Sequence, residues 1–309
     1  FAGVLRIDVD RRGGTVSRGG GNVVGGILGA PAGTVNGFLR VTEQGETINQ
    51  KYGNRTIAER HLELATAATL KTSLRPTPQP EEAWQEVMTG MAEASKKTYR
   101  EMVYEHPQFI DYFRHATPID VIERMGIGSR PASRRSGQGV ENLRAIPWVF
   151  SWAQCRIALP AAYGMGTALA NAKDKFGLDT LKTMSRNWLF FGSMLSDVEM
   201  ALAKSDLDIG KRYSELAPEP SRMVFDLIDT ELRLAKSMIL SIKEQEDLLD
   251  GEPTLQRSIR LRNPYVDPMS ILQVDLLRRW RADQCQDEEL LEALLVTVNG
   301  IARGIQNTG

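Results

Sequence analysis

Apolar residues recur at three- and four-residue steps over most of the chain, which is the spacing of helices with one buried face. The longest such patterns each predict a helix and cover 57–74, 81–105, 194–207, 223–249, 267–282 and 287–306. Shorter patterns predict helices over 22–28 and 106–118, the second closed by Pro118. Asp250-Gly251 is typical of a helix C-cap, so we expect the 223–249 helix to end there.

Two stretches alternate between apolar and polar residues and predict short strands, "GVLRIDVD" (3–10) and the start of "FLRVTEQGE" (38–46). Glycine, serine and proline are frequent in 29–37 and 126–139, which we interpret as turns and a loop. The run "LRAIPWVFSWAQCRIALP" (143–160) is aromatic and apolar, so we expect it to be largely buried. The pattern predicts a mainly α fold with a few strands.

Glycine spacing produces two misleading patterns. Residues 19–39 carry no charge and have glycine at every fourth position, as in membrane GxxxG helices, but their glycines, Pro31 and two asparagines make them too weakly apolar to insert. "GMGTALA" (164–170) resembles a dinucleotide-binding fingerprint, yet it follows a proline-marked helical run instead of a strand. We therefore predict neither a membrane span nor a nucleotide site.

Composition is that of a soluble globular protein, with 309 residues, 42% hydrophobic residues, 25% charged residues and a net charge of −1. The absence of a basic excess argues against a nucleic-acid partner. Cys155 and Cys285 are far apart, and the three histidines lack metal-ligand spacing, so we expect no disulfide and no metal site, as in a cytoplasmic protein. The chain begins at Phe1 without a signal peptide, and we expect it to be part of a longer protein.

Two glycine-flanked groups of arginines stand out. "RRGGTVSRGGG" (11–21) contains Arg12 and Arg18, and a second group contains Arg130, Arg134, Arg135 and Arg144. Glycine lets backbone N–H groups approach a ligand, and arginine grips phosphate or carboxylate bidentately. The alternatives are a solvated basic loop or a flexible RGG segment that binds RNA, although no aromatic residue interrupts the loop. We predict that the arginines converge on one small, multiply charged anion.

Seven segments of the sequence carry a resemblance to a known family. They are "RGGTVSRGGG", "GTVNGFLRVTEQGE", "GSRPASRR", "LRAIPWVFSWAQCR", "EMALAKSDL", "LRNPYVDPMSILQ" and "NGIARGIQNTG". Together and in this order they resemble the carboxyl-terminal third of phosphoenolpyruvate carboxylases. The resemblance implies that residues 1–309 are a single region of the catalytic domain, the last part of a helix-rich β/α barrel. It also implies a cytoplasmic enzyme that is a homotetramer when full length.

The resemblance implies a reaction as well. Bicarbonate and phosphoenolpyruvate give oxaloacetate and phosphate through carboxyphosphate and the pyruvate enolate, with Mg²⁺ or Mn²⁺ whose ligands lie outside this chain. The substrate-binding positions that match the family are Arg12, Arg18, Arg130 and Arg144, with Arg18 also catalytic. The positions that match an inhibitory aspartate or malate site are Arg18, Lys204, Arg262 and Asn307.

One position departs from the family pattern. Where the family has Phe-His-Gly-Arg-Gly-Gly, residues 9–14 read Val-Asp-Arg-Arg-Gly-Gly, so Asp10 occupies the place of a catalytic histidine. A carboxylate there repels anionic intermediates. Other catalytic residues of the family lie upstream of the matching segments, so we expect the isolated chain to be inactive. The alternative is a pseudoenzyme that binds anionic effectors without turnover.

Overall fold

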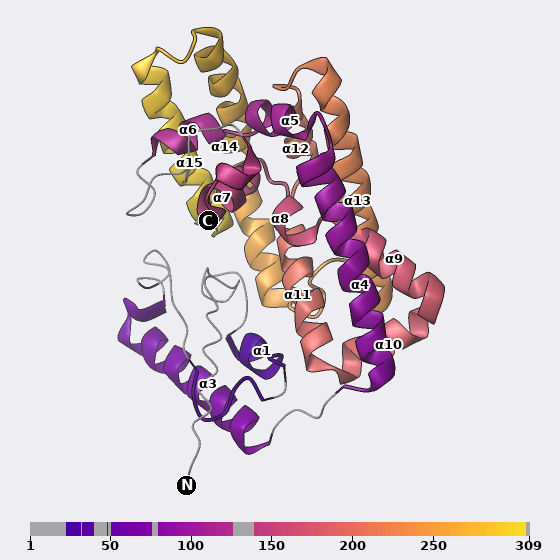
Figure 1. Cartoon of the computed structure of the whole chain (residues 1–309). Helices are drawn as coiled ribbons and strands as arrows, with labels where there is room; N and C mark the ends of the chain where they lie inside the picture. The colour runs from indigo at the N-terminus through magenta and orange to yellow at the C-terminus, as the bar shows by residue number, and fades with distance from the viewer. Residues whose placement is uncertain are drawn as a thin grey trace. The chain divides into compact units, whose positions relative to one another are not determined.

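The computed structural model describes residues 23–31, 33–39, 48, 51–75, 80–125 and 139–306. Its helices (Figure 1) are α1 (Val23–Leu28), α3 (Arg55–Leu74), α4 (Glu82–Arg100), α5 (Phe109–Ala116), α6 (Ile119–Arg124), α7 (Ala145–Gln154), α8 (Leu159–Ala162), α9 (Met165–Phe176), α10 (Leu178–Asn187), α11 (Leu189–Ala203), α12 (Leu207–Ser214), α13 (Glu219–Lys243), α14 (Pro253–Ala282) and α15 (Glu288–Ile305). A π-helical turn (Glu101–Glu105) extends α4, and a 3₁₀ turn (Val140–Asn142) precedes α7.

The mainly α prediction is confirmed, because the described residues contain helices and no strand. The strand expected over 3–10 lies outside these residues. Phe38 and Leu39 are not in a strand, and the rest of 38–46 also lies outside. The β/α barrel therefore stays a prediction. None of the helices in the described part of the chain is both long enough and apolar enough to cross a membrane.

The chain divides into two compact units. The first comprises Phe1–Glu86 and Asp179–Asp197, and the second comprises Val87–Leu178 and Val198–Gly309. In the first unit, α1 packs on α3 around Ile27, Val35 and Ala68. Gly29 lies so close to Ser193 that an added Cβ would come within 2.6 Å of its Oγ, so Gly29 serves close packing.

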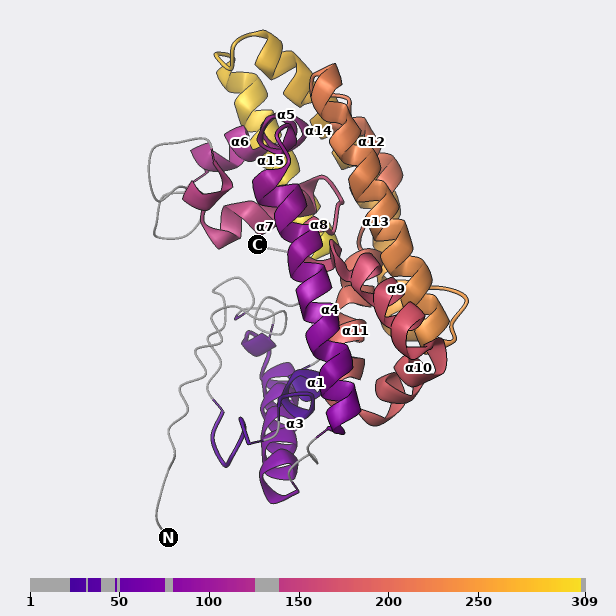
Figure 2. The ribbon, with the colours of Figure 1, turned by 45° about the vertical axis from the view of Figure 1, so that its right-hand side comes forward.

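In the second unit, α9 packs along α13 (Figures 1 and 2). Gly166 makes this approach possible, since an added Cβ would lie 2.7 Å from both the Glu231 carbonyl oxygen and the Ala235 nitrogen. The buried Glu231 carboxylate accepts hydrogen bonds from the backbone N–H of Thr167 (2.9 Å) and from its hydroxyl (2.7 Å). The "GMGTALA" motif therefore serves packing, and a carboxylate of the protein already occupies the start of α9.

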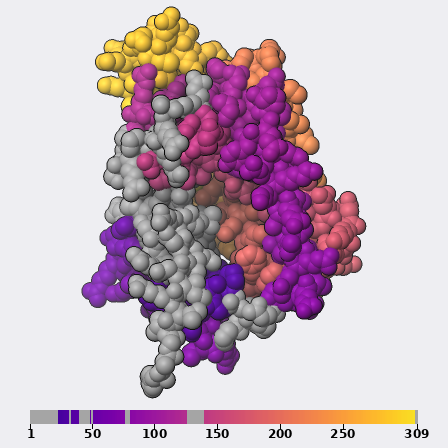
Figure 3. All heavy atoms as spheres, in the orientation of Figure 1, coloured from indigo at the N-terminus to yellow at the C-terminus, as the bar shows by residue number. Residues whose placement is uncertain are grey.

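Helices α14 and α15 form an antiparallel hairpin whose tip lies at the surface, yellow in Figure 3. Val266, Ile301 and Ile305 form its buried seam. Gly304 faces Val266 with no room for a Cβ, and Gly300 faces the sulfur of Met269 in the same way. Two glycines one helical turn apart thus allow the hairpin to close tightly, a role that the periodicity of α15 did not reveal.

Several predicted helix ends are wrong. The helix expected over 194–207 is α11, which covers Leu189–Ala203, and Leu207 begins α12. Helix α13 ends at Lys243, with Glu244 in the left-handed conformation, and not at Asp250-Gly251. Helix α14 begins at Pro253 and continues through Pro264 and Pro268, although the sequence predicted a start only at Asp267. Proline disfavours a helix interior because it lacks an N–H and crowds the preceding turn. Packing against α15 holds the helix together across both prolines.

The aromatic run over 143–160 is buried as predicted. Its helix α7 faces α5, and the ring centroids of Trp148 and Phe113 lie 5.1 Å apart. Trp152 packs at 5.6 Å from Phe113 and at 6.0 Å from Phe109. These ring contacts hold α7 in place between Arg144, its N-cap residue, and Arg156, two positions after its last residue.

Candidate functional site

The predicted site residues fall into two groups. Those outside the described residues, whose predicted roles stay predictions, are Asp10, Arg12, Arg18, Arg130 and Asn307. Those that the structure describes are Arg144, Lys204 and Arg262, all in the second unit. The convergence of four arginines on one ligand therefore stays a prediction.

Arg144 is the N-cap residue of α7 and makes no side-chain cap. Its Nε is buried, and among the described residues it has no hydrogen-bond partner. The N–H groups of Ala145 and Ile146 stand at the same helix end, where the helix dipole is positive. A buried guanidinium nitrogen without a partner costs free energy, and an anion that accepts its hydrogen bond removes that cost.

Lys204 and Arg262 come from different segments of the chain, and the charge of Arg262 acts on Lys204. Lys204 follows the last residue of α11, and Arg262 lies in the middle of α14. The Arg262 guanidinium donates to the Ser258 carbonyl (2.9 Å) and to the Gly304 carbonyl near the end of α15 (3.0 Å). Asn307 itself lies outside the described residues, three positions after Gly304.

The two positive charges lie close enough to oppose each other. Burial, and then the Arg262 charge, lower the pKa of Lys204 from 10.5 to about 8. Burial also lowers the pKa of Arg262. Among the described residues neither side chain forms an ion pair with a carboxylate. Two partly buried cations without a counter-ion suit a small dianion, which relieves both the repulsion and the desolvation.

Sequence reasoning missed Arg156, a buried residue two positions after α7. Its guanidinium donates to the Lys204 carbonyl (3.0 Å), to Asp267 Oδ1 (2.8 Å) and to Asn263 Oδ1 (3.2 Å). The sequence did contain a signal, because Arg144 and Arg156 are the only charges in the apolar run over 143–160. A charge inside such a run has to find partners within the protein.

Comparison with known proteins gives the family of the chain. The family model described as "Phosphoenolpyruvate carboxylase" matches residues 10–309. The chain belongs to the phosphoenolpyruvate carboxylase family. It is 52% identical over 302 residues to a phosphoenolpyruvate carboxylase of Xanthomonas euvesicatoria pv. vesicatoria (strain 85-10). It is 45% identical to one of Azoarcus sp. (strain BH72) and 42% identical to one of Roseiflexus castenholzii (strain DSM 13941 / HLO8).

These alignments cover 96% of this chain and 33% of the relatives, so the chain spans about a third of the length of the phosphoenolpyruvate carboxylases it matches. The family match includes Arg12, Arg18 and their glycines. Both cysteines are free. Among the described residues, no three His, Cys, Asp or Glu side chains are grouped as a metal site requires.

Proposed function

We propose that this chain supplies substrate and effector contacts to a phosphoenolpyruvate carboxylase, which joins bicarbonate to phosphoenolpyruvate and releases oxaloacetate and phosphate. The observation that carries the proposal is Arg144, whose buried Nε has no partner among the described residues and stands at the uncapped start of α7. Family membership supports the identity of the anion. In this proposal Arg12, Arg18 and Arg130 hold the same substrate.

The proposed role of Arg144 follows from the charge of the reacting species. Phosphoenolpyruvate, carboxyphosphate and the enolate are all anions, and charge that is already fixed in place stabilises them without reorganisation. Trp148 has no proposed contact with the substrate, but its packing against Phe113 and Trp152 holds the first turn of α7 rigid. A guanidinium anchored on a rigid helix start loses little entropy when the substrate binds.

Replacement of Arg144 tests the proposal. We expect Arg144→Gln to weaken the binding of phosphoenolpyruvate to the 309-residue chain by at least ten-fold, measured by isothermal titration calorimetry. In a full-length enzyme the same change should cost about 3 kcal/mol of transition-state stabilisation, on the scale of a lost oxyanion donor. Arg279→Gln is the matched control, because the Arg279 side chain is 61% exposed and its contact with Asp275 is long, at 4.0 Å.

Equal affinity in the wild type and the Arg144→Gln variant would contradict the substrate role of Arg144. Binding that falls equally in both variants would indicate a general charge effect. A wild-type chain that binds no phosphoenolpyruvate would contradict the proposal as a whole.

We propose further that Lys204 and Arg262, with Arg18 and Asn307, bind aspartate or malate as an inhibitor. The support is the pair of partly buried, unneutralised cations, which matches the two carboxylates of a four-carbon dicarboxylic acid. Dependence on Mg²⁺ or Mn²⁺, assembly as a homotetramer and the absence of a nucleic-acid partner stay predictions.

A further inference from the structure

The proposed function gives no role to Arg156, a buried charge of the second unit. Arg156 is only 2% exposed, and its backbone adopts the left-handed conformation (φ 58°). A non-glycine residue in this conformation costs about 1 kcal/mol or more and persists only when its surroundings hold it. Here the Arg156 carbonyl accepts the N–H of Asp206 (2.8 Å), which is the N-cap residue of α12.

Arg156 thus forms two hydrogen bonds with the junction between α11 and α12. Its carbonyl binds Asp206, and its Nε donates to the carbonyl of Lys204 at 3.0 Å. These two bonds enclose the three residues 204–206. The backbone that carries the Lys204 side chain is therefore held by Arg156 and not only by the end of α11.

The other side of the guanidinium holds α14. Its Nη1 donates to Asp267 at 2.8 Å and its Nη2 donates to Asn263 at 3.2 Å, one turn apart on the helix. Asn263 directly follows Arg262. One planar group therefore links the backbone of Lys204 to the residue next to Arg262, although the two lie on separate segments of the chain.

The charge of Arg156 is balanced within the protein. Asp267 neutralises Arg156, and this ion pair is largely enclosed on the arginine side. The carboxylate is thereby kept from Lys204 and Arg262, which form no ion pair among the described residues. Lys204 and Arg262 remain for an external anion, whereas the charge of Arg156 is neutralised within the protein by Asp267.

We propose that Arg156 is a positioning residue of the effector site, which sets Lys204 and Arg262 at the separation that a four-carbon dicarboxylate bridges. This inference rests on the proposed effector function. It assigns Arg156 no contact with the effector itself. It predicts that effector affinity depends on the planar fork of Arg156, which a lysine at the same position cannot replace because an ammonium cannot span three acceptors in this geometry.

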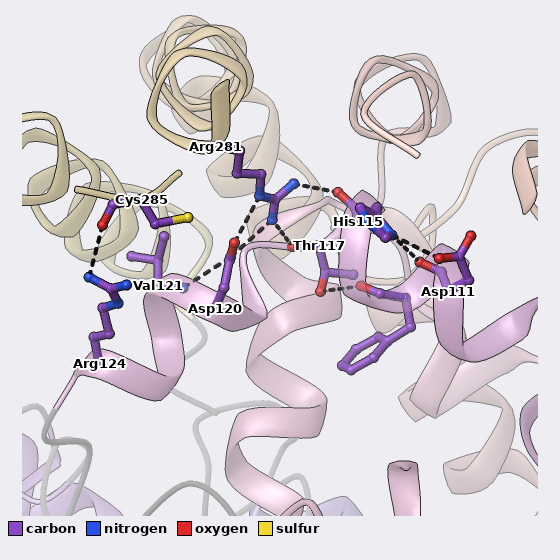
Figure 4. Close-up of polar contacts among 9 residues, drawn as sticks. Asp111, His115, Thr117, Asp120, Val121, Arg124, Arg281 and Cys285 are labelled. Carbon is purple, nitrogen blue, oxygen red and sulfur yellow. Dashed lines mark hydrogen bonds and ion pairs between the residues drawn. The ribbon is translucent and has the colours of Figure 1, made fainter. Parts of the chain in front are cut away.

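The test compares Arg156 with Arg281, a second arginine that joins α14 to a distant segment. Arg281, at the end of α14, donates to both carboxylate oxygens of Asp120 (2.8 and 2.9 Å) and to the Thr117 carbonyl (2.7 Å), as Figure 4 shows. It is likewise a largely buried guanidinium that joins α14 to a distant segment, but it touches neither Lys204 nor Arg262. Arg281→Lys therefore makes the same chemical change as Arg156→Lys at an arginine that touches neither proposed effector residue.

Aspartate binding is measured by calorimetry on the folded 309-residue chain, with circular dichroism melts for each variant. We expect Arg156→Lys to raise the aspartate Kd at least ten-fold and to leave the phosphoenolpyruvate Kd within two-fold. Arg281→Lys should change neither by more than two-fold. A role limited to stability would lower the melting temperature in both variants without this split.

The outcomes separate the inference from the function on which it rests. A wild-type chain that does not bind millimolar aspartate overturns the effector function. Wild-type binding with an unchanged Kd in Arg156→Lys overturns the positioning role alone. Should Arg156→Lys fail to fold, Asn263→Ala removes one anchor from a partly exposed position and leaves the pair with Asp267. It should raise the aspartate Kd at least three-fold, and an unchanged Kd in that variant also overturns the role.

Discussion

At the scale of single residues, Lys204 has an unusual titration. Its pKa is lowered to about 8 by burial and by the Arg262 charge, so the amine is charged below pH 8 and mostly neutral above it. An anionic effector binds the charged form. We expect the aspartate Kd to rise as the pH increases from 7 to 9, approaching ten-fold per pH unit above the pKa. Calorimetry at pH 7, 8 and 9 measures this change.

The matched variant is Lys204→Arg, which keeps its charge throughout this range and should flatten the pH dependence. A Kd for the wild type that does not change between pH 7 and 9 would contradict the role of the amine. The same shift affects stability. The unfolded chain binds more protons than the folded chain between pH 8 and 10.5, so without effector the Lys204 contribution to the free energy of unfolding rises with pH over that window.

At the scale of elements, close packing of α9 on α13 depends on Gly166. A methyl group there would meet backbone atoms of Glu231 and Ala235 at 2.7 Å, and backbone cannot move aside as a side chain can. We expect Gly166→Ala to lower the free energy of unfolding by about 1–3 kcal/mol, the usual cost of overpacking. Urea denaturation followed by circular dichroism measures the difference.

Gly90 provides the control within α4. An added Cβ at Gly90 meets nothing within 4 Å, so Gly90→Ala only reduces the freedom of the unfolded chain and should stabilise the protein by about 0.5–1 kcal/mol. The two Gly→Ala substitutions should therefore change the free energy of unfolding in opposite directions, because only Gly166 is closely packed. If Gly166→Ala proved neutral or stabilising, the close approach of α9 and α13 would be wrong.

At the scale of the whole molecule, the expectation concerns turnover. The sequence motifs predict that Asp10 replaces a catalytic histidine of the family, where a carboxylate would repel anionic intermediates. The chain also spans about a third of the length of its relatives. We expect the 309-residue chain to bind phosphoenolpyruvate and aspartate but to form no oxaloacetate from phosphoenolpyruvate, bicarbonate and Mg²⁺, in an assay coupled to malate dehydrogenase and NADH. Steady turnover would show that Asp10 does not impair catalysis.

Much of the secondary structure could be predicted because it depends on neighbours three and four residues apart. The pattern over 57–74 predicted α3 almost to its ends, and Asn54 caps that helix through the N–H groups of Thr56 and Ile57. The continuation of α14 through Pro264 could not be predicted in this way. Its cost is local, whereas the contacts with α15 that offset it come from a separate helix.

The residue pattern alone was enough to predict the helical class and the burial of the aromatic run, and the ordered family motifs predict that Lys204 and Arg262 share one site. How these two side chains are held follows instead from contacts between distant segments. Arg156 reaches Lys204 across 48 positions and Asn263 across 107. No local period links residues so far apart, because their contact depends on how α7, α11 and α14 pack, and the hydrophobic pattern of each helix specifies a buried face but not the partner that covers it.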